Sequence, residues 1–168
     1  MRFVSDNVFH IEKSPQYAAV GDSVKTVEFV RAIGEKLLFV EAKSSFSNPN
    51  SLASNRGMGN KTVKEIFQKE IAGICDKFTH SLNLYSSVSV TKEGFPPGYV
   101  PAARLTLTFM LVTKGFEESW CDEIERALNR RIRESVCMSK MWKPEVVVIN
   151  DATAAKRKIA VSYEIVTE

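Results

Sequence analysis

The chain has 168 residues, of which 44% are hydrophobic and 26% are charged. This length suits one hydrophobic core, so we expect a single domain over residues 1–168. The net charge of +3 permits a nucleic-acid partner but does not argue for one. No run approaches the ~18 apolar residues of a membrane span, and the three cysteines form no zinc or CxxC pattern. We therefore expect a soluble, cytoplasmic protein with reduced thiols and no membrane partner.

The first third of the chain has the patterns of strands. Residues 7–13 alternate apolar Phe9 and Ile11 with polar His10 and Glu12, which is typical of a short strand. Residues 14–22 contain Pro and Gly and predict a loop. Residues 24–33 and 36–45 are rich in β-branched and aromatic side chains, and Gly34-Glu35 between them suits a two-residue turn. These two segments predict a tight β-hairpin.

The two-residue turn sets the register of this hairpin. It places Ile33 opposite Lys36 and Glu28 opposite Glu41. Because side chains alternate between faces, one face is expected to carry Thr26, Glu28, Val30, Phe39, Glu41 and Lys43, with Thr26 opposite Lys43 and Val30 opposite Phe39. The other face, expected to pack into the core, carries Val27, Phe29, Leu38, Val40 and Ala42.

The remaining elements follow from periodicity and from turn residues. Ser, Asn and Gly predict a loop over 44–60, and Gly and Pro another over 91–101. Apolar residues at three- and four-residue steps predict amphipathic helices from 62 to about 85 and over 117–138. Strands are expected at 104–113, 145–150 and 159–166, with a turn or short helical segment at 151–158. The expected class is α/β in the α+β sense, a mixed sheet with an antiparallel hairpin and two helices.

Two carboxylates directly opposed on paired strands repel each other. A cation between them removes this cost, and Mg²⁺ commonly binds one or two carboxylates together with substrate phosphates. Lys43, two residues beyond Glu41, would lie on the same face and could hold an attacking water or stabilise phosphate charge. We therefore consider Glu28 and Glu41 as metal ligands, with Lys43 as their catalytic partner.

The pattern of Glu28, a short hairpin and then Glu41-Ala42-Lys43 resembles the PD-(D/E)XK nuclease superfamily. The resemblance implies a restriction-endonuclease-like core of three antiparallel strands, a helix and a fourth strand. It also implies Mg²⁺-dependent hydrolysis of phosphodiester bonds, with two acids binding the metal and the lysine assisting the water. In this chain the first acid is Glu28 where the family usually has Asp, and no proline precedes it.

Other interpretations of the same residues remain open. Glu28, Glu41 and Lys43 could lie on a solvated sheet face, with Lys43 or Lys25 offsetting the acids. The protein could then be a non-catalytic interaction or oligomeric scaffold protein on the same fold with a decayed site, forming homo-oligomers, or a nucleic-acid-binding module without chemistry.

Several further side chains are candidates for a role. Basic residues flanking the long loop, namely Arg56, Lys61 and Lys64, are candidates for contacting the phosphates of DNA or RNA. Arg126, Arg130 and Arg133 on the second helix could do the same, or could instead pair with Asp122 and Glu123 or their neighbours along the helix. Glu65 and Gln68, early in the first helix, and Glu12 are the other side chains that could reach the site.

Overall fold

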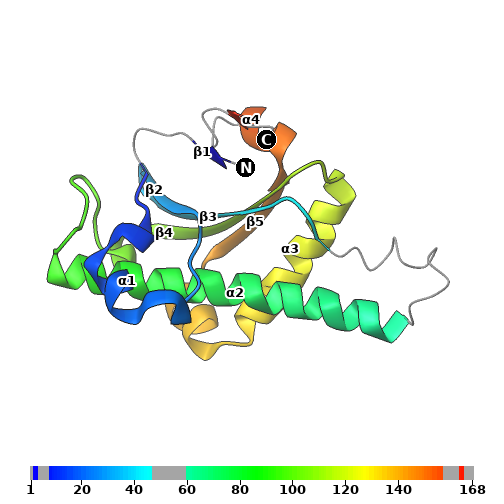
Figure 1. Ribbon diagram of the computed structural model, residues 1–168, viewed down its shortest axis with the longest axis horizontal. Coiled ribbons are helices and arrows are strands. Elements are labelled where there is room, and N and C mark those ends of the chain that lie inside the picture. Colours follow the sequence, from blue (N-terminus) through cyan, green and yellow to red (C-terminus); the bar gives the residue numbers. More distant parts are fainter. Residues whose placement is uncertain (1, 4–7, 47–59, 157–162, 165–168) are drawn as a thin grey trace.

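The computed structural model describes residues 2–3, 8–46, 60–156 and 163–164, and a four-stranded mixed sheet forms its centre (Figure 1). The strands lie in the order β2 (Phe29–Ile33), β3 (Lys36–Lys43), β4 (Thr106–Thr113) and β5 (Glu145–Asn150). β2 and β3 are antiparallel, whereas β3, β4 and β5 run parallel to one another. The predicted α+β class, with a mixed sheet containing one antiparallel hairpin, is confirmed.

The hairpin turn has the expected geometry. Gly34 adopts φ +57°, which an L side chain disfavours, at the first central position of the turn. The ladder pairs Ile33 with Lys36 and Val30 with Phe39, as the two-residue turn predicted. It ends with Phe29 opposite Val40, so the expected strand over 24–33 begins five residues later than predicted.

Two helices cover the same face of the sheet. α2 (Asn60–Thr91) connects β3 to β4, and α3 (Glu118–Arg133) connects β4 to β5. Parallel crossover connections are right-handed, so successive crossovers in one direction place their helices on one side, as Figure 1 shows. Beneath the helices lies the larger apolar core, in which the Phe78 ring of α2 stacks on Phe109 of β4 with centroids 4.7 Å apart.

The opposite face of the sheet carries a second, smaller apolar cluster. Phe29, Leu38 and Val40 of the hairpin belong to it, together with Ala154 of the short helix α4 (Asp151–Lys156). The prediction that these hairpin residues are buried is therefore confirmed. Val27, however, packs into the larger core with Val30 and Phe39, so its expected placement on the Phe29 face is wrong.

The N-terminal segment differs from the predicted strand. Among the described residues 8–13, only Phe9 pairs with the sheet, through two backbone hydrogen bonds of 2.8 Å with Val30. The chain then turns into the 3-10 helix η1 (Ile11–Lys13), so a strand over 7–13 is wrong. The expected loop at 14–22 instead contains the short helix α1 (Pro15–Val20) and the start of the 3-10 turn η2 (Gly21–Ser23). The Ser14 hydroxyl caps α1 by accepting a hydrogen bond from the Tyr17 N–H.

The segments near the ends of β4 and α3 also adopt specific conformations. A 3-10 turn, η4 (Ala102–Arg104), leads into β4. α3 ends at Arg133, earlier than predicted, and a π-helical segment, η5 (Cys137–Trp142), follows it. No helix within the described ranges is long and apolar enough to cross a membrane.

Two predicted elements lie largely beyond the described residues. Most of the loop predicted over 44–60 is one of them, because 47–59 are not described. Of the last predicted strand, the described part is β6 (Tyr163–Glu164), which pairs antiparallel with β1 (Arg2–Phe3) in a separate two-stranded sheet.

Two glycine substitutions test the hairpin turn. Gly34→Ala should destabilise the protein by about 1 kcal/mol, because the alanine must adopt a left-handed conformation. Gly73→Ala, inside α2 with no atom within 4 Å of the added Cβ, should stabilise it by about 0.5–1 kcal/mol. Urea unfolding followed by circular dichroism measures both changes. Equal effects of the same sign at the two positions would contradict the assignment of the turn.

Candidate functional site

Glu41 is the charged residue buried most deeply in the described part of the sheet. It lies in β3 on the face covered by α2, two residues after Phe39, and only 1% of its surface is exposed. One carboxylate oxygen, Oε1, accepts a hydrogen bond from the Lys77 ammonium of α2 at 2.5 Å. The other, Oε2, is buried without a hydrogen-bond partner among the described residues. Only one of the two carboxylate oxygens of Glu41 therefore has a hydrogen-bond partner among the described residues.

Burial dominates the electrostatics of this carboxyl group. It raises the pKa of Glu41 from 4.5 to about 7, against the opposing effects of the hydrogen bond and charge of Lys77. Among the smaller effects, the charge of Glu28 raises this pKa further and the charge of Lys43 lowers it. All three predicted catalytic residues therefore belong to one electrostatic cluster, and near neutral pH the Glu41 carboxyl is poised between its neutral and ionised forms.

The position of Glu28 follows from where the hairpin ends. The Val27 N–H donates to the Ser81 hydroxyl of α2 at 2.9 Å, so the chain before Phe29 leaves β3 and turns toward the helix. Glu28 therefore lies just beyond the last ladder pair, Phe29 with Val40, and the expected cross-strand pairing of Glu28 with Glu41 is not formed. Its side chain is exposed, and its carbonyl oxygen is 3.1 Å from His10 Nδ1. Glu28 is thus at the surface, whereas Glu41 is buried.

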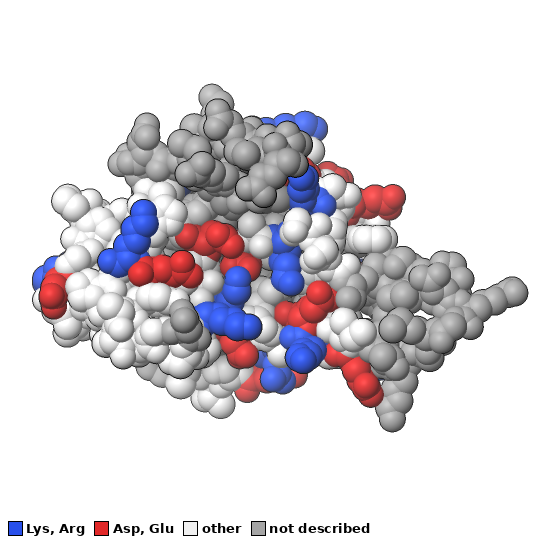
Figure 2. Space-filling view, viewed as in Figure 1, with Lys and Arg blue, Asp and Glu red and all other residues white. Residues whose placement is uncertain are grey.

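Lys43 lies near the end of β3 with its side chain partly exposed. Its ammonium is 3.9 Å from the Glu70 carboxylate of α2 and 5.9 Å from the centre of the Phe46 ring. The hairpin ladder ends at Phe29 opposite Val40, so the expected pairing of Lys43 with Thr26 is wrong. The Thr26 hydroxyl donates to Glu12 at 2.9 Å. Figure 2 shows acidic and basic side chains interleaved over the region where the hairpin meets α2.

The two α2 residues that reach this cluster are not those singled out from the sequence. Glu70 and Lys77 are seven residues apart, about two helical turns, and therefore share one flank of the helix. Gln68 lies on the other flank, where it lines a hollow against α3, and Glu65 is exposed. The sequence signal that could have identified Glu70 and Lys77 is their seven-residue spacing beside the apolar stripe of the helix. Helical periodicity, however, does not show which strand these two residues contact.

Of the predicted phosphate-binding residues that flank the long loop, Lys61 and Lys64 belong to the first turns of α2. Lys64 is exposed in the first turns of the helix. Arg56 lies outside the described residues, and Lys61 is described only as part of the α2 backbone. Their role therefore stays a prediction.

The residues present include oxygen donors of the kind that a divalent cation binds. Within the described ranges, no three His, Cys, Asp or Glu side chains gather as a metal-binding group. Mg²⁺, however, commonly uses one or two carboxylates and keeps several waters. The unpartnered Oε2 of Glu41 and the exposed carboxylate of Glu28 supply this kind of oxygen. Ionising Glu41 beside a cation would also relieve the burial cost that raises its pKa.

Comparisons of this chain with protein-family models, with curated proteins and with solved structures found no match.

The raised pKa of Glu41 makes stability depend on pH. Well below pH 4.5 the Glu41 carboxyl is protonated in both the folded and the unfolded state, so it adds no pH dependence to the stability. As pH rises toward 7, the unfolded chain loses this proton first, so the folded state loses about 3 kcal/mol relative to it. Glu41→Gln removes this dependence and should be the more stable protein above pH 7, by up to that amount. Urea unfolding at a series of pH values measures the difference.

Glu93→Gln, at an exposed position, is the matched control and should follow the wild type throughout. A stability difference between Glu41→Gln and wild type that stays constant from pH 4.5 to 7 would show that Glu41 does not titrate in this range.

Proposed function

We propose that this protein is a metal-dependent, nuclease-like phosphodiesterase that acts on nucleic acid. The observation that carries the proposal is the buried Glu41 carboxylate, which has one oxygen unpartnered and lies two residues before Lys43 on the central hairpin strand. A structural ion pair alone does not require the second oxygen to stay bare. A divalent cation bound by Glu41 and Glu28 accounts for the bare oxygen and for two acids in one cluster.

The location of the cluster agrees with this chemistry. β3, β4 and β5 are parallel and end at Lys43, Thr113 and Asn150 respectively. Ligands of open α/β sheets bind outside the carboxyl ends of the strands, where loops leave room for a substrate. Glu41 and Lys43 are in the last three residues of β3 and therefore lie at this end.

The proposed roles follow from burial and reach. Glu41 and Glu28 would hold Mg²⁺, which when bound supplies a Lewis acid that polarises the phosphoryl oxygen and activates a water. The Lys43 ammonium lies 3.9 Å from Glu70 and is partly exposed. Because it is within reach of solvent, it can orient that water or stabilise charge on the phosphate. Lys77 positions the Glu41 carboxylate through Oε1 and leaves Oε2 directed elsewhere. The proposed setting is the cytoplasm, where the free Cys75, Cys121 and Cys137 would stay reduced.

A second candidate function rests on the same ion pair. The Lys77 ammonium contacts Glu41 at 2.5 Å and can offset its charge without any metal. In that case the cluster is the remnant of a site, and the protein is a non-catalytic interaction or oligomeric scaffold on the same fold.

Nucleic-acid cleavage distinguishes the two candidates. Wild-type protein with Mg²⁺ or Mn²⁺ should cleave plasmid, single-stranded DNA or RNA, and the activity should disappear with EDTA. Glu41→Gln and Lys43→Met should each lower the rate at least about 100-fold, since each removes a group that acts on the reacting phosphate. Product formation on denaturing gels measures the rate.

Glu93→Gln serves as the surface control and should cleave at the wild-type rate. Cleavage that persists in Glu41→Gln would assign the activity to other residues. A folded wild-type protein that cleaves none of these substrates would favour the scaffold.

A further inference from the structure

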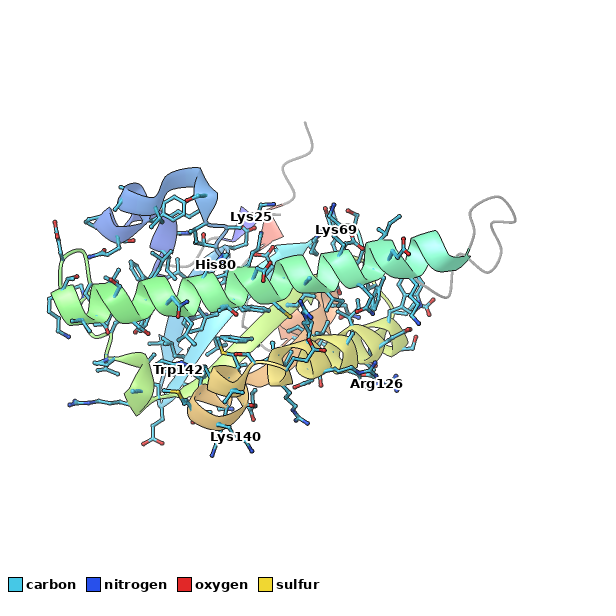
Figure 3. All side chains as sticks on the ribbon, turned by 90° about the horizontal axis from the view of Figure 1, so that it is seen from below. Lys25, Lys69, His80, Arg126, Lys140 and Trp142 are labelled. Atoms are coloured by element: carbon cyan, nitrogen blue, oxygen red, sulfur yellow. The ribbon has the colours of Figure 1, made fainter. Side chains whose placement is uncertain are left out.

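A concentration of positive charge outside the candidate site lies at the end of α3. Residues 126–143 contain six Arg and Lys residues and a single acid, Glu134. Five of the cations form what we call the α3 basic surface, and all five are exposed: Arg126, Arg130, Arg133, Lys140 and Lys143. Figure 3 shows the labelled Arg126 and Lys140 on the side of α3 and η5 that faces away from α2.

These cations are largely unneutralised by the rest of the described chain. Glu134 is taken by Arg131, at 2.7 Å. Arg126 donates to the backbone carbonyl of Asp122 at 3.2 Å rather than to a carboxylate. For Arg130, Arg133, Lys140 and Lys143, no described carboxylate lies within ion-pairing distance. Like charges gathered in this way repel one another, and a polyanion relieves the repulsion.

The surface is hollowed at two places, and each hollow contains one of these arginines. A hollow of 310 Å³ between α2 and α3 is lined by Arg130, Lys69 and Gln68, and also by Arg131 and Glu134, which pair with each other. A second, of 340 Å³, lies between α3 and η5 and is lined by Arg133, Lys143 and Ser139. Arginine forks and neighbouring hydroxyl or amide groups are the donors that bind phosphate oxygens.

The backbone after α3 holds Lys143 beside the second hollow. Its N–H donates to the Met138 carbonyl at 2.7 Å and closes the π-helical turn. Lys143 itself adopts φ +46°, a conformation that a non-glycine residue adopts only when its surroundings impose it. Lys140 and Lys143 are therefore presented from a defined turn.

We propose that the α3 basic surface binds the phosphate backbone of a nucleic acid, with one phosphate in each hollow. The choice of nucleic acid among polyanions rests on the proposed function. Gln68 and Ala72, which line the first hollow, are on the flank of α2 opposite to Glu70 and Lys77. The surface therefore anchors the substrate away from the reacting phosphate, and it recognises phosphate rather than base sequence.

Binding to labelled DNA, measured by fluorescence anisotropy in EDTA, tests this proposal without cleavage. The Arg130→Gln/Arg133→Gln double variant should bind at least about tenfold more weakly than wild type, and its plot of log K against log salt should lose about two units of slope, one per phosphate contact. Lys92→Gln/Arg104→Gln removes the same charge from exposed positions elsewhere and should bind within about twofold of wild type. Equal losses in the two double variants, or none in either, would overturn the proposal.

Two further measurements distinguish phosphate binding at this surface from a membrane contact and from cleavage at Glu41. Vesicles rich in phosphatidylserine test whether exposed Val136 and Met141 make this segment a membrane contact; binding to vesicles but not to DNA would overturn the proposal. Glu93→Gln, the surface control, should bind DNA as wild type does. If only the Arg130→Gln/Arg133→Gln variant loses DNA binding and the wild-type protein never cleaves nucleic acid, phosphate binding at the α3 basic surface is supported and the proposed function is rejected. Cleavage that depends on Glu41, together with unchanged DNA binding in the Arg130→Gln/Arg133→Gln variant, would support the proposed function and overturn phosphate binding at the α3 basic surface.

Discussion

The contact between Glu41 and Lys77 joins the central strand of the sheet to the long helix that covers it. The Glu41 carboxylate, buried beneath the helix, loses its hydrogen bonds to water, and the Lys77 ammonium replaces them at one oxygen only. The other charged residues of the cluster lie around this carboxyl group, whose Oε2 has no hydrogen-bond partner among the described residues. Val27 turns toward Ser81 of α2 and Glu28 is exposed, while Lys43 extends toward Glu70. The site is therefore a charged seam between the hairpin and α2.

This arrangement separates two kinds of surface on the helical side of the molecule. On one flank of α2, charges of both signs surround a buried acid, and this is where we propose that a metal ion and the reacting phosphate bind. Beyond the other flank, α3 carries cations with few partners, which suits a long polyanion. The division follows from the two right-handed crossovers, because they place α2 between the hairpin and α3.

Much of the fold could be predicted from local signals. Gly34 determined the turn and hence the hairpin register, and Pro144 preceded the strand at 145–150 as expected. The face of the hairpin that the helices cover could not be predicted, because Val30 and Phe39 on one side are as apolar as Phe29 and Leu38 on the other. The strand predicted around Phe9 failed because a short alternating pattern also fits one bridge followed by a 3-10 turn. The Glu41–Lys77 contact depends on tertiary packing that periodicity does not encode.

The titration of Glu41 tests the central claim most directly. Side-chain carboxyl carbons of ¹³C-labelled glutamate report each carboxyl separately, and the Glu41→Gln spectrum assigns the signal. In the absence of divalent ions the Glu41 signal should titrate with a pKa of about 7. Saturating Mg²⁺ should lower that pKa by at least about one unit, because a cation favours the ionised form. A pKa near 4.5 without metal, or one that Mg²⁺ leaves unchanged, would contradict the account of Glu41 as a buried carboxylate that binds a cation.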